Sequence, residues 1–267
     1  MYSSITKEVN TLYKTKEYLM EEYIHKKRSE SDIAREWGIS SKLLHYYIKK
    51  NGLVGIKSRR KYSVNEDLFS MANPIFCYYA GLIATDGYVD YKNHRVSVRV
   101  KNEGSKEVFL SLKKSFDFTG NIRRYKDSND LTITSDRLID KLRLFGIRKN
   151  ETTKTYSLRF PKFWASEDCM RMFCRGVLDG DGNIHIKGQF RIVTASVPFI
   201  KGLSNLLHRH LGIDCPVSSA KIRGVTYPKL ELRLNESFIF YDWVYSGFHS
   251  FRFSDKFNRY QMLKMKR

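Results

Sequence analysis

The sequence has few cysteines and no long apolar run. Its four cysteines, at positions 77, 169, 174 and 215, show no CxxC or Cys/His spacing, which argues against a zinc-ribbon type of metal site and against a disulfide framework. No stretch approaches the roughly 18 consecutive apolar residues of a membrane helix, and the first ten residues do not resemble a signal peptide. We therefore expect a protein that stays inside the cell, away from the membrane, with reduced thiols.

Acidic residues are also scarce. The chain of 267 residues holds 28 Asp and Glu against 48 Lys and Arg, a formal net charge of +20. Hydrophobic residues make up 42% and aromatic residues 14%, which excludes a disordered basic tail. A folded protein with such an excess of positive charge usually binds a polyanion, and nucleic acid is the most common one. Ribosome association and an acidic membrane surface are the alternatives.

The N-terminal segment 1–53 is predicted to be a small all-α, helix-turn-helix-like DNA-binding domain. Its apolar positions fit two short helices that meet near Gly38, which can adopt the positive φ of a tight turn, and Ser40 can cap the second helix. In a helix-turn-helix the second helix enters the major groove. The residues expected to face outward on it are Ser41, Lys42, His45, Tyr46 and Lys49. The alternative is a plain helical hairpin with a solvated basic face.

Residues 54–72 carry a run of positive charge and few apolar residues, without periodicity. We predict a basic linker here. Arg59 and Arg60 are expected to lie along DNA phosphates.

The rest of the chain reads as a two-fold repeat, with one half at 73–165 and a second at 166–267. Asn73 followed by Pro74 is a strong helix start, and Ser166 provides a second one. After each start, helical and alternating segments follow in the order α-β-β-α-β-β-α. The predicted fold class is α+β, with a pseudo-two-fold duplicated αββαββα core.

Each half begins with an apolar helix that ends on a carboxylate. Small residues four apart, Gly81 and Thr85 in the first helix and Gly176 and Gly180 in the second, line one face of each helix. Two such helices can cross with their backbones close together. Their C-terminal acids, Asp86 and Asp181, would then lie side by side. Adjacent carboxylates repel unless a cation is bound, and the negative ends of both helix dipoles also favour one. A hard divalent ion, Mg²⁺ first, fits these oxygen ligands.

The segments YAGLIATDG (79–87) and CRGVLDGDG (174–182) resemble the two motif copies of single-chain LAGLIDADG homing endonucleases. Ala84 stands where the motif has its first Asp, while the acid before the last Gly is kept in both copies. The resemblance implies a saddle whose two four-stranded sheets straddle duplex DNA. It also implies that Asp86 and Asp181 bind the metal and the scissile phosphate, with Mg²⁺ as cofactor and Mn²⁺ as a substitute.

The resemblance further implies one basic catalytic residue late in each half. Lys154 and Lys256 are the candidates in this sequence, and each would support the attacking water and the developing charge. An ordinary exposed charge is the alternative for either lysine.

The implied reaction is hydrolysis of one phosphodiester per strand at a long, largely asymmetric double-stranded DNA site, as in intron homing. With both motif copies in one chain, a monomer is expected. The candidates for the groove-facing surface are Arg95, Arg99, Arg123, Arg124, Arg191, Lys221, Arg223 and Arg233. A phosphate contact or plain solvation is the alternative for each of them.

A protein that binds without cutting is the rival from another class. It would be a transcription regulator, favoured by the N-terminal segment, or an RNA splicing maturase with intron RNA as a partner. Two metal-binding acids favour the nuclease, because a binder has no use for paired carboxylates against phosphate.

Overall fold

The computed structural model describes residues 11–26, 28–54, 62–101, 103–147, 158–247 and 250–267. The chain divides into two compact units, Met1–Tyr62 and Ser63–Arg267. No helix among these residues is long and apolar enough to cross a membrane. Lys154, Arg59 and Arg60, which were candidates for catalysis or DNA binding, lie outside the described residues.

The first unit is all-helical. It contains a 3₁₀ turn at Leu12–Lys14, α2 (Lys16–Leu19), a π-helical turn at Met20–His25, α3 (Glu30–Glu36) and α4 (Ser41–Lys50). The turn between α3 and α4 forms as expected: Gly38 has a φ of +61°, and the Ser40 hydroxyl accepts a hydrogen bond from the Leu43 amide at 3.2 Å. A buried cluster that includes Leu19, Ile33, Leu44 and Ile48 holds these helices together.

The second unit consists of two halves with the same element order. The first half runs α5 (Pro74–Asp86), β1 (Gly87–Asp90), β2 (Arg95–Val100), α6 (Glu103–Ser115), β3 (Arg123–Tyr125), β4 (Ser128–Thr134) and α7 (Asp136–Leu144). The second runs α9 (Glu167–Asp179), β5 (Asn183–Ile184), β6 (Phe190–Val193), α10 (Val197–Leu211), β7 (Ser218–Ile222), β8 (Val225–Glu231), α11 (Leu234–Tyr245) and α12 (Ser254–Met265). The predicted αββαββα repeat is confirmed, with α12 as an additional helix.

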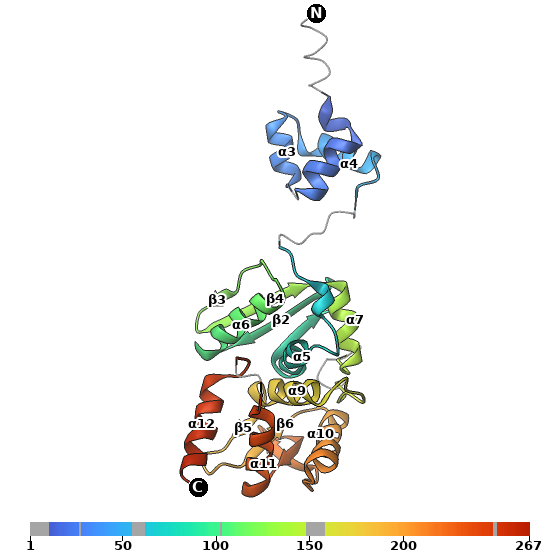
Figure 1. The fold of residues 1–267 in the computed structure, drawn as a ribbon. Helices are drawn as coiled ribbons and strands as arrows, with labels where there is room; N and C mark the ends of the chain where they lie inside the picture. Colours follow the sequence, from blue (N-terminus) through green and yellow to red (C-terminus); the bar gives the residue numbers. More distant parts are fainter. Residues whose placement is uncertain (1–10, 27, 55–61, 102, 148–157, 248–249) are drawn as a thin grey trace, which may run out of the picture. The chain divides into compact units, whose positions relative to one another are not determined.

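Both sheets are antiparallel and have equivalent strand orders, β1-β2-β4-β3 and β5-β6-β8-β7. α5 and α9 lie next to each other in the middle of the unit, with the elements of the first half on one side and those of the second half on the other (Figure 1). Each sheet buries one face, as Val96, Val98 and Leu131 show in the first. The other face is polar.

The start of the second unit corrects the predicted linker. Residues 63–72 were assigned to it, but Phe69 is fully buried, with its ring 5.4 Å from those of Phe76 and Phe116. The backbone is anchored as well, since the Asn65 amide donates to the Phe116 carbonyl at 2.8 Å. A single buried aromatic side chain beside the short 3₁₀ turn Glu66–Leu68 leaves no periodic pattern, so it could not be predicted from the sequence. The other domain boundaries stay predictions.

Candidate active site

The two motif helices cross with their backbones in contact. A Cβ built on Gly176 would lie 2.2 Å from the Tyr78 carbonyl oxygen and 3.0 Å from the Gly81 Cα. A Cβ on Gly81 would lie 2.3 Å from the Phe173 carbonyl oxygen. Only glycine permits so close an approach of two backbones. The small-residue faces inferred from the sequence therefore form the contact between α5 and α9.

This crossing brings the ends of α5 and α9 together. Asp86 is the last residue of α5, and a Cβ on Gly180 would lie 3.3 Å from its Oδ2 atom. The Asp86 carboxylate therefore lies against the residue that precedes Asp181. Both acids are exposed. Asp181 was expected at the C-terminal end of the second motif helix, but α9 ends at Asp179, so Asp181 lies in the turn that follows the helix.

Each acid also lines a hollow over its own sheet. A hollow of about 380 Å³ is lined by Asp86, Tyr88 and the polar face of the first sheet. A second, of about 350 Å³, is lined by Asp181, Asn183, His185 and the polar face of the second sheet. The two acids thus occupy equivalent places in the two halves, where the motif helices meet the open sheet faces.

Three of the predicted arginines gather on the open face of the first sheet. Arg95 and Arg99 lie four residues apart on β2, and Arg123 pairs with Asp130, the same residue that faces Arg99. The Arg99 guanidinium is 4.9 Å from the centre of the Tyr125 ring, and its Nε is 3.7 Å from the Asp130 carboxylate. Arg124 is the neighbour of Arg123 on β3, and strand alternation turns it to the opposite face.

The second sheet separates the predicted residues further. Arg191 pairs with Glu231 and lines the hollow beside Asp181. Lys221 pairs with Thr226, whereas Ile222 lines the hollow, so alternation puts Lys221 on the opposite face from Arg191. This corrects the expectation that both face the groove. Arg223 lies in the two-residue turn between β7 and β8, and Arg233 occupies the N-cap position of α11, where its amide donates to the Glu236 carboxylate at 2.8 Å.

Lys229 was not singled out from the sequence, although it lies on the same face as Arg191. It pairs with Val193, two residues from Arg191 on β6, and its Nζ is 2.6 Å from the Glu231 carboxylate. The signal that could have identified it is the alternation of Lys229 and Glu231. Using that signal requires the strand register, which the turn at Arg223 and Gly224 fixes.

In the N-terminal unit, the residues expected to face outward on α4 are all exposed: Ser41, Lys42, His45, Tyr46 and Lys49. Leu44 and Ile48 on the same helix are fully buried. The Nδ1 atom of His45 lies 3.2 Å from the Glu30 carboxylate, so this histidine also contacts α3. Exposure makes these five side chains accessible to a groove, and their contact with DNA stays a prediction.

Lys256 belongs to α12, and its side chain reaches the C-terminal end of α9, near Asp86 and Asp181. Its ammonium donates to the carbonyl oxygens of Leu178, Asp179 and Gly180 at 2.8, 2.6 and 2.7 Å. Burial lowers the pKa of Lys256, while the nearby carboxylates, Asp86 and Asp181 among them, act in the opposite direction. The lysine predicted to be catalytic therefore binds the backbone of the motif helix.

A buried charged network behind the site was not foreseen. Asp179 is 2% exposed, and its Oδ2 atom accepts hydrogen bonds from the Tyr78 hydroxyl at 2.8 Å and the Phe253 amide at 3.0 Å. Burial raises the pKa of Asp179 to about 7, although the Lys256 charge opposes this shift. Arg175 is fully buried one turn earlier. A sequence signal existed, because Arg175 and Asp179 are charged residues of the second motif copy in addition to Asp181, at positions where the first copy has alanine.

The carboxylates of Asp86 and Asp181 fit a hard divalent ion. Among the residues that the structure describes, no group of three or more His, Cys, Asp or Glu side chains could hold a metal. A metal at the crossing would thus take these two carboxylates from the protein and its other ligands from water and phosphate. Mg²⁺ is commonly bound in this way, through one or two carboxylates plus substrate phosphates.

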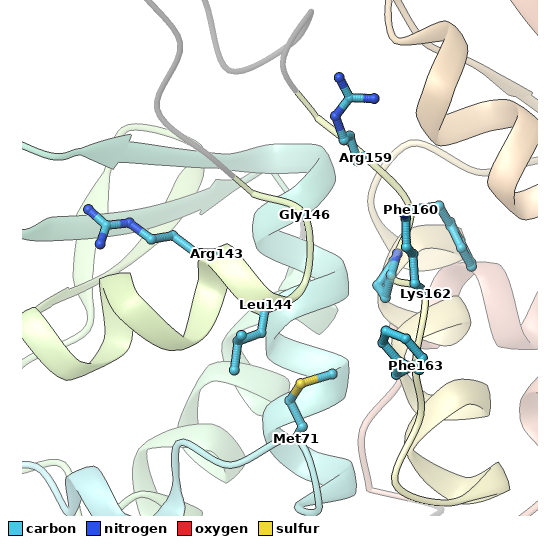
Figure 2. Close-up of a pocket in the computed structure, with 9 residues that line it drawn as sticks. Met71, Arg143, Leu144, Gly146, Arg159, Phe160, Lys162 and Phe163 are labelled. Atoms are coloured by element: carbon cyan, nitrogen blue, oxygen red, sulfur yellow. The ribbon is translucent and has the colours of Figure 1, made fainter.

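A larger cavity, of about 630 Å³, lies away from the acids. It is bordered by Arg143 and Leu144 at the end of α7 and by Arg159, Phe160 and Phe163 ahead of α9 (Figure 2). Neither Asp86 nor Asp181 is part of its lining. The candidate active site is therefore the helix crossing and not this cavity.

The fold defines the class of protein that this chain resembles. The crystal structure of I-DmoI in complex with DNA and Ca is similar to this chain at 16% sequence identity and a TM-score of 0.50, covering 72% of this chain and 100% of I-DmoI. I-DmoI is described as a homing endonuclease. At this identity the likeness shows the fold, and the second unit has the LAGLIDADG fold of I-DmoI.

Full-length DUF199/WhiA from Thermatoga maritima is similar at 13% identity and a TM-score of 0.49, over 76% of this chain and 64% of its own. The N-terminal LAGLIDADG domain of DUF199/WhiA is similar at 12% identity and a TM-score of 0.47, over 76% of this chain and 98% of that domain. No family model and no curated protein matches the sequence.

Proposed function

We propose that this protein is a metal-dependent, site-specific endonuclease that hydrolyses one phosphodiester bond in each strand of duplex DNA. The observation that carries the proposal is the crossing at Gly81 and Gly176, which brings the helix ends bearing Asp86 and Asp181 together. Two carboxylates close together repel each other, and a cation that both of them bind relieves this repulsion. Such a pair is useful where a cation must be held against a phosphate.

In this proposal Asp86 and Asp181 hold Mg²⁺, or Mn²⁺ in its place. The metal ions would supply an activated water and stabilise the charge that develops on the leaving 3′ oxygen. The role of the protein is to fix the two carboxylates and the scissile phosphates relative to one another. The direct glycine contact suits that role, because a rigid crossing leaves the acids little freedom.

The open sheet faces would bind the DNA on either side of the cleavage site. Arg95, Arg99 and Arg123 in the first half and Arg191 in the second lie on these faces, next to the two acids. Arg is the most common reader of guanine in the major groove. Because the two halves present different side chains, the target would be long and largely asymmetric, and one chain would be enough to bind it.

The N-terminal unit would add affinity or site choice. Its α4 exposes Lys42, His45 and Lys49 on the side away from its core, as the recognition helix of a helix-turn-helix does. The site of action would be inside the cell, where duplex DNA is found.

A second candidate keeps the DNA or RNA binding and removes the chemistry. A helical unit joined to this core suits a transcription regulator, and an RNA splicing maturase would use intron RNA instead. Both would act without Asp86 and Asp181, so the two acids discriminate between these functions and the nuclease.

A cleavage assay tests the proposal. Supercoiled plasmids that carry a library of candidate sites are incubated with the full chain and Mg²⁺, and in parallel with a chelator. We expect linear product at a small set of sites with Mg²⁺ and none with the chelator. Binding to selected sites without any cleavage in Mg²⁺ or Mn²⁺ would favour the regulator.

A further inference from the structure

Lys256 closes the end of the second motif helix. The last carbonyl groups of an α-helix have no partner within the helix, and they form the negative end of its dipole. At the end of α9, the ammonium of Lys256 accounts for three of them, those of Leu178, Asp179 and Gly180. An ammonium has three N–H donors and no acceptor, and all three donors are used here.

The segment that leads into α12 is attached to the same helix by two more charged side chains. Arg175 donates from Nε to the Val244 carbonyl and from Nη2 to the Ser246 carbonyl, each at 2.8 Å. Asp179 accepts from the Phe253 amide. Three charged residues therefore tie α9 to the chain between the end of α11 and the first turn of α12.

The two motif copies differ at the positions that make these bonds. Arg175 and Asp179 occupy the places of Ala80 and Ala84 when YAGLIATDG and CRGVLDGDG are aligned. Both side chains are buried, and a buried ionisable group is costly unless it is hydrogen-bonded or neutral. Asp179 keeps the first Asp of the motif and Arg175 departs from the motif, and both side chains bind the segment that brings Lys256 to the end of α9.

The position of Asp181 depends on this helix end. Asp181 directly follows Gly180, whose carbonyl binds Lys256, and the turn continues with hydrogen bonds from the Gly180 amide to the Gly176 carbonyl and from the Gly182 amide to the Val177 carbonyl. We propose that Lys256 is a positioning residue: its three hydrogen bonds fix the end of α9 and thereby hold the Asp181 carboxylate in place for catalysis. The catalytic part of this inference rests on the proposed nuclease function.

Two other roles for Lys256 make different predictions. If Lys256 acted only as a positive charge beside the acids, an arginine would replace it. If it exchanged a proton with the attacking water, its loss would change the pH dependence of cleavage. A positioning lysine is not replaced by arginine, because a planar guanidinium fork does not converge on three carbonyls of one helix end.

Hydrogen exchange on the free protein tests the three-carbonyl contact without DNA, metal or turnover. We compare Lys256→Met and Lys256→Arg with wild type, and use Lys264→Met as the matched control. Lys264 lies on the same helix and binds the Asp242 side chain of α11 at 2.5 Å. The amides of Gly180 and Gly182 should exchange about 10-fold faster in both Lys256 variants. They should stay within about 2-fold of wild type in the control, and the α10 amides should change in none of the three variants.

Single-turnover cleavage and DNA affinity on the same variants test the consequence. Both Lys256 variants should lose at least about 30-fold in cleavage rate, about 2 kcal/mol, while DNA affinity stays within about 3-fold and the pH–rate profile keeps its shape. Lys264→Met should cleave like wild type.

Unchanged exchange in Lys256→Met, rescue of cleavage by Lys256→Arg, or full cleavage despite faster exchange would each overturn the inference. If wild type bound DNA and never cut it, the nuclease proposal would fail, while the exchange measurement would still decide whether Lys256 fixes the end of α9.

Discussion

Gly81 of the first motif helix and Gly176 of the second face each other so closely that a Cβ built on Gly176 would lie 3.0 Å from the Gly81 Cα. This contact fixes the positions of the two helix ends relative to one another, and therefore the positions of Asp86 and Asp181. The same Cβ on Gly176 would be only 2.2 Å from the Tyr78 carbonyl oxygen, which is a backbone atom and cannot move aside easily.

Gly176→Ala should therefore destabilise the second unit. Forcing one extra carbon into a tight contact typically costs about 1–3 kcal/mol, and a backbone clash puts this variant at the upper end. Urea unfolding of the full chain measures the effect, with Lys201→Ala at an exposed position of α10 as the control. A Gly176→Ala protein as stable as the control would show that the backbones are not in contact.

The buried carboxyl of Asp179 should make stability depend on pH. Burial raises its pKa to about 7 in the folded protein, whereas an unfolded Asp loses its proton near pH 4, about its ordinary value. The stabilising contribution of the Asp179 carboxyl to the free energy of unfolding is therefore full below about pH 4. It is lost as the pH rises towards 7.

Asp179→Asn removes this dependence, because an amide does not titrate. From pH 5 to pH 8, the free energy of unfolding of Asp179→Asn should rise by on the order of 2 kcal/mol relative to that of wild type. Unfolding measured across this range on both proteins tests the direction. A difference that stays constant with pH would mean that Asp179 is already ionised in the folded protein at pH 5.

DNA binding should depend steeply on salt, and the two faces of the second sheet should contribute unequally. Neutralising several phosphates makes the affinity fall with increasing salt through counterion release.

Arg191→Ala, on the open face, should weaken binding about 10-fold, roughly 1–2 kcal/mol. Lys221→Ala, on the opposite face, should weaken it less than about 2-fold. Equal losses in the two variants would contradict the assignment of the groove-facing side.

Truncation of the N-terminal unit should separate DNA binding from cleavage, provided that the truncated protein keeps the buried residues of the second unit. Removing residues 1–62 should leave specific cleavage detectable at high protein concentration and weaken DNA binding. Removing 1–72 would also take away Phe69, which is fully buried against Phe76 and Phe116, so this protein should be about 3–5 kcal/mol less stable. A folded 63–267 protein with no cleavage would place part of the chemistry in the N-terminal unit.

The sequence was most informative where the chemistry is local. Asn73 with Pro74, and Ser166, could be recognised as helix starts because a cap binds an amide only two or three residues away. The glycine faces could be recognised from their spacing. The contacts of Arg175, Asp179 and Lys256 span about 70 to 80 residues of sequence, and no local pattern encodes them. The face on which Lys221 lies depends on a register that one two-residue turn decides.

The cleavage of one DNA target by Asp86→Asn and Asp181→Asn tests the central claim most directly. Each change keeps the shape of the side chain and removes the charge that would hold a cation, so double-strand cleavage should fall by at least about 1,000-fold in either variant. DNA affinity should stay the same or increase, because the phosphates lose a like-charged neighbour, and stability should not fall, because the repulsion between the acids is relieved. Unimpaired double-strand cleavage by either variant would contradict the account.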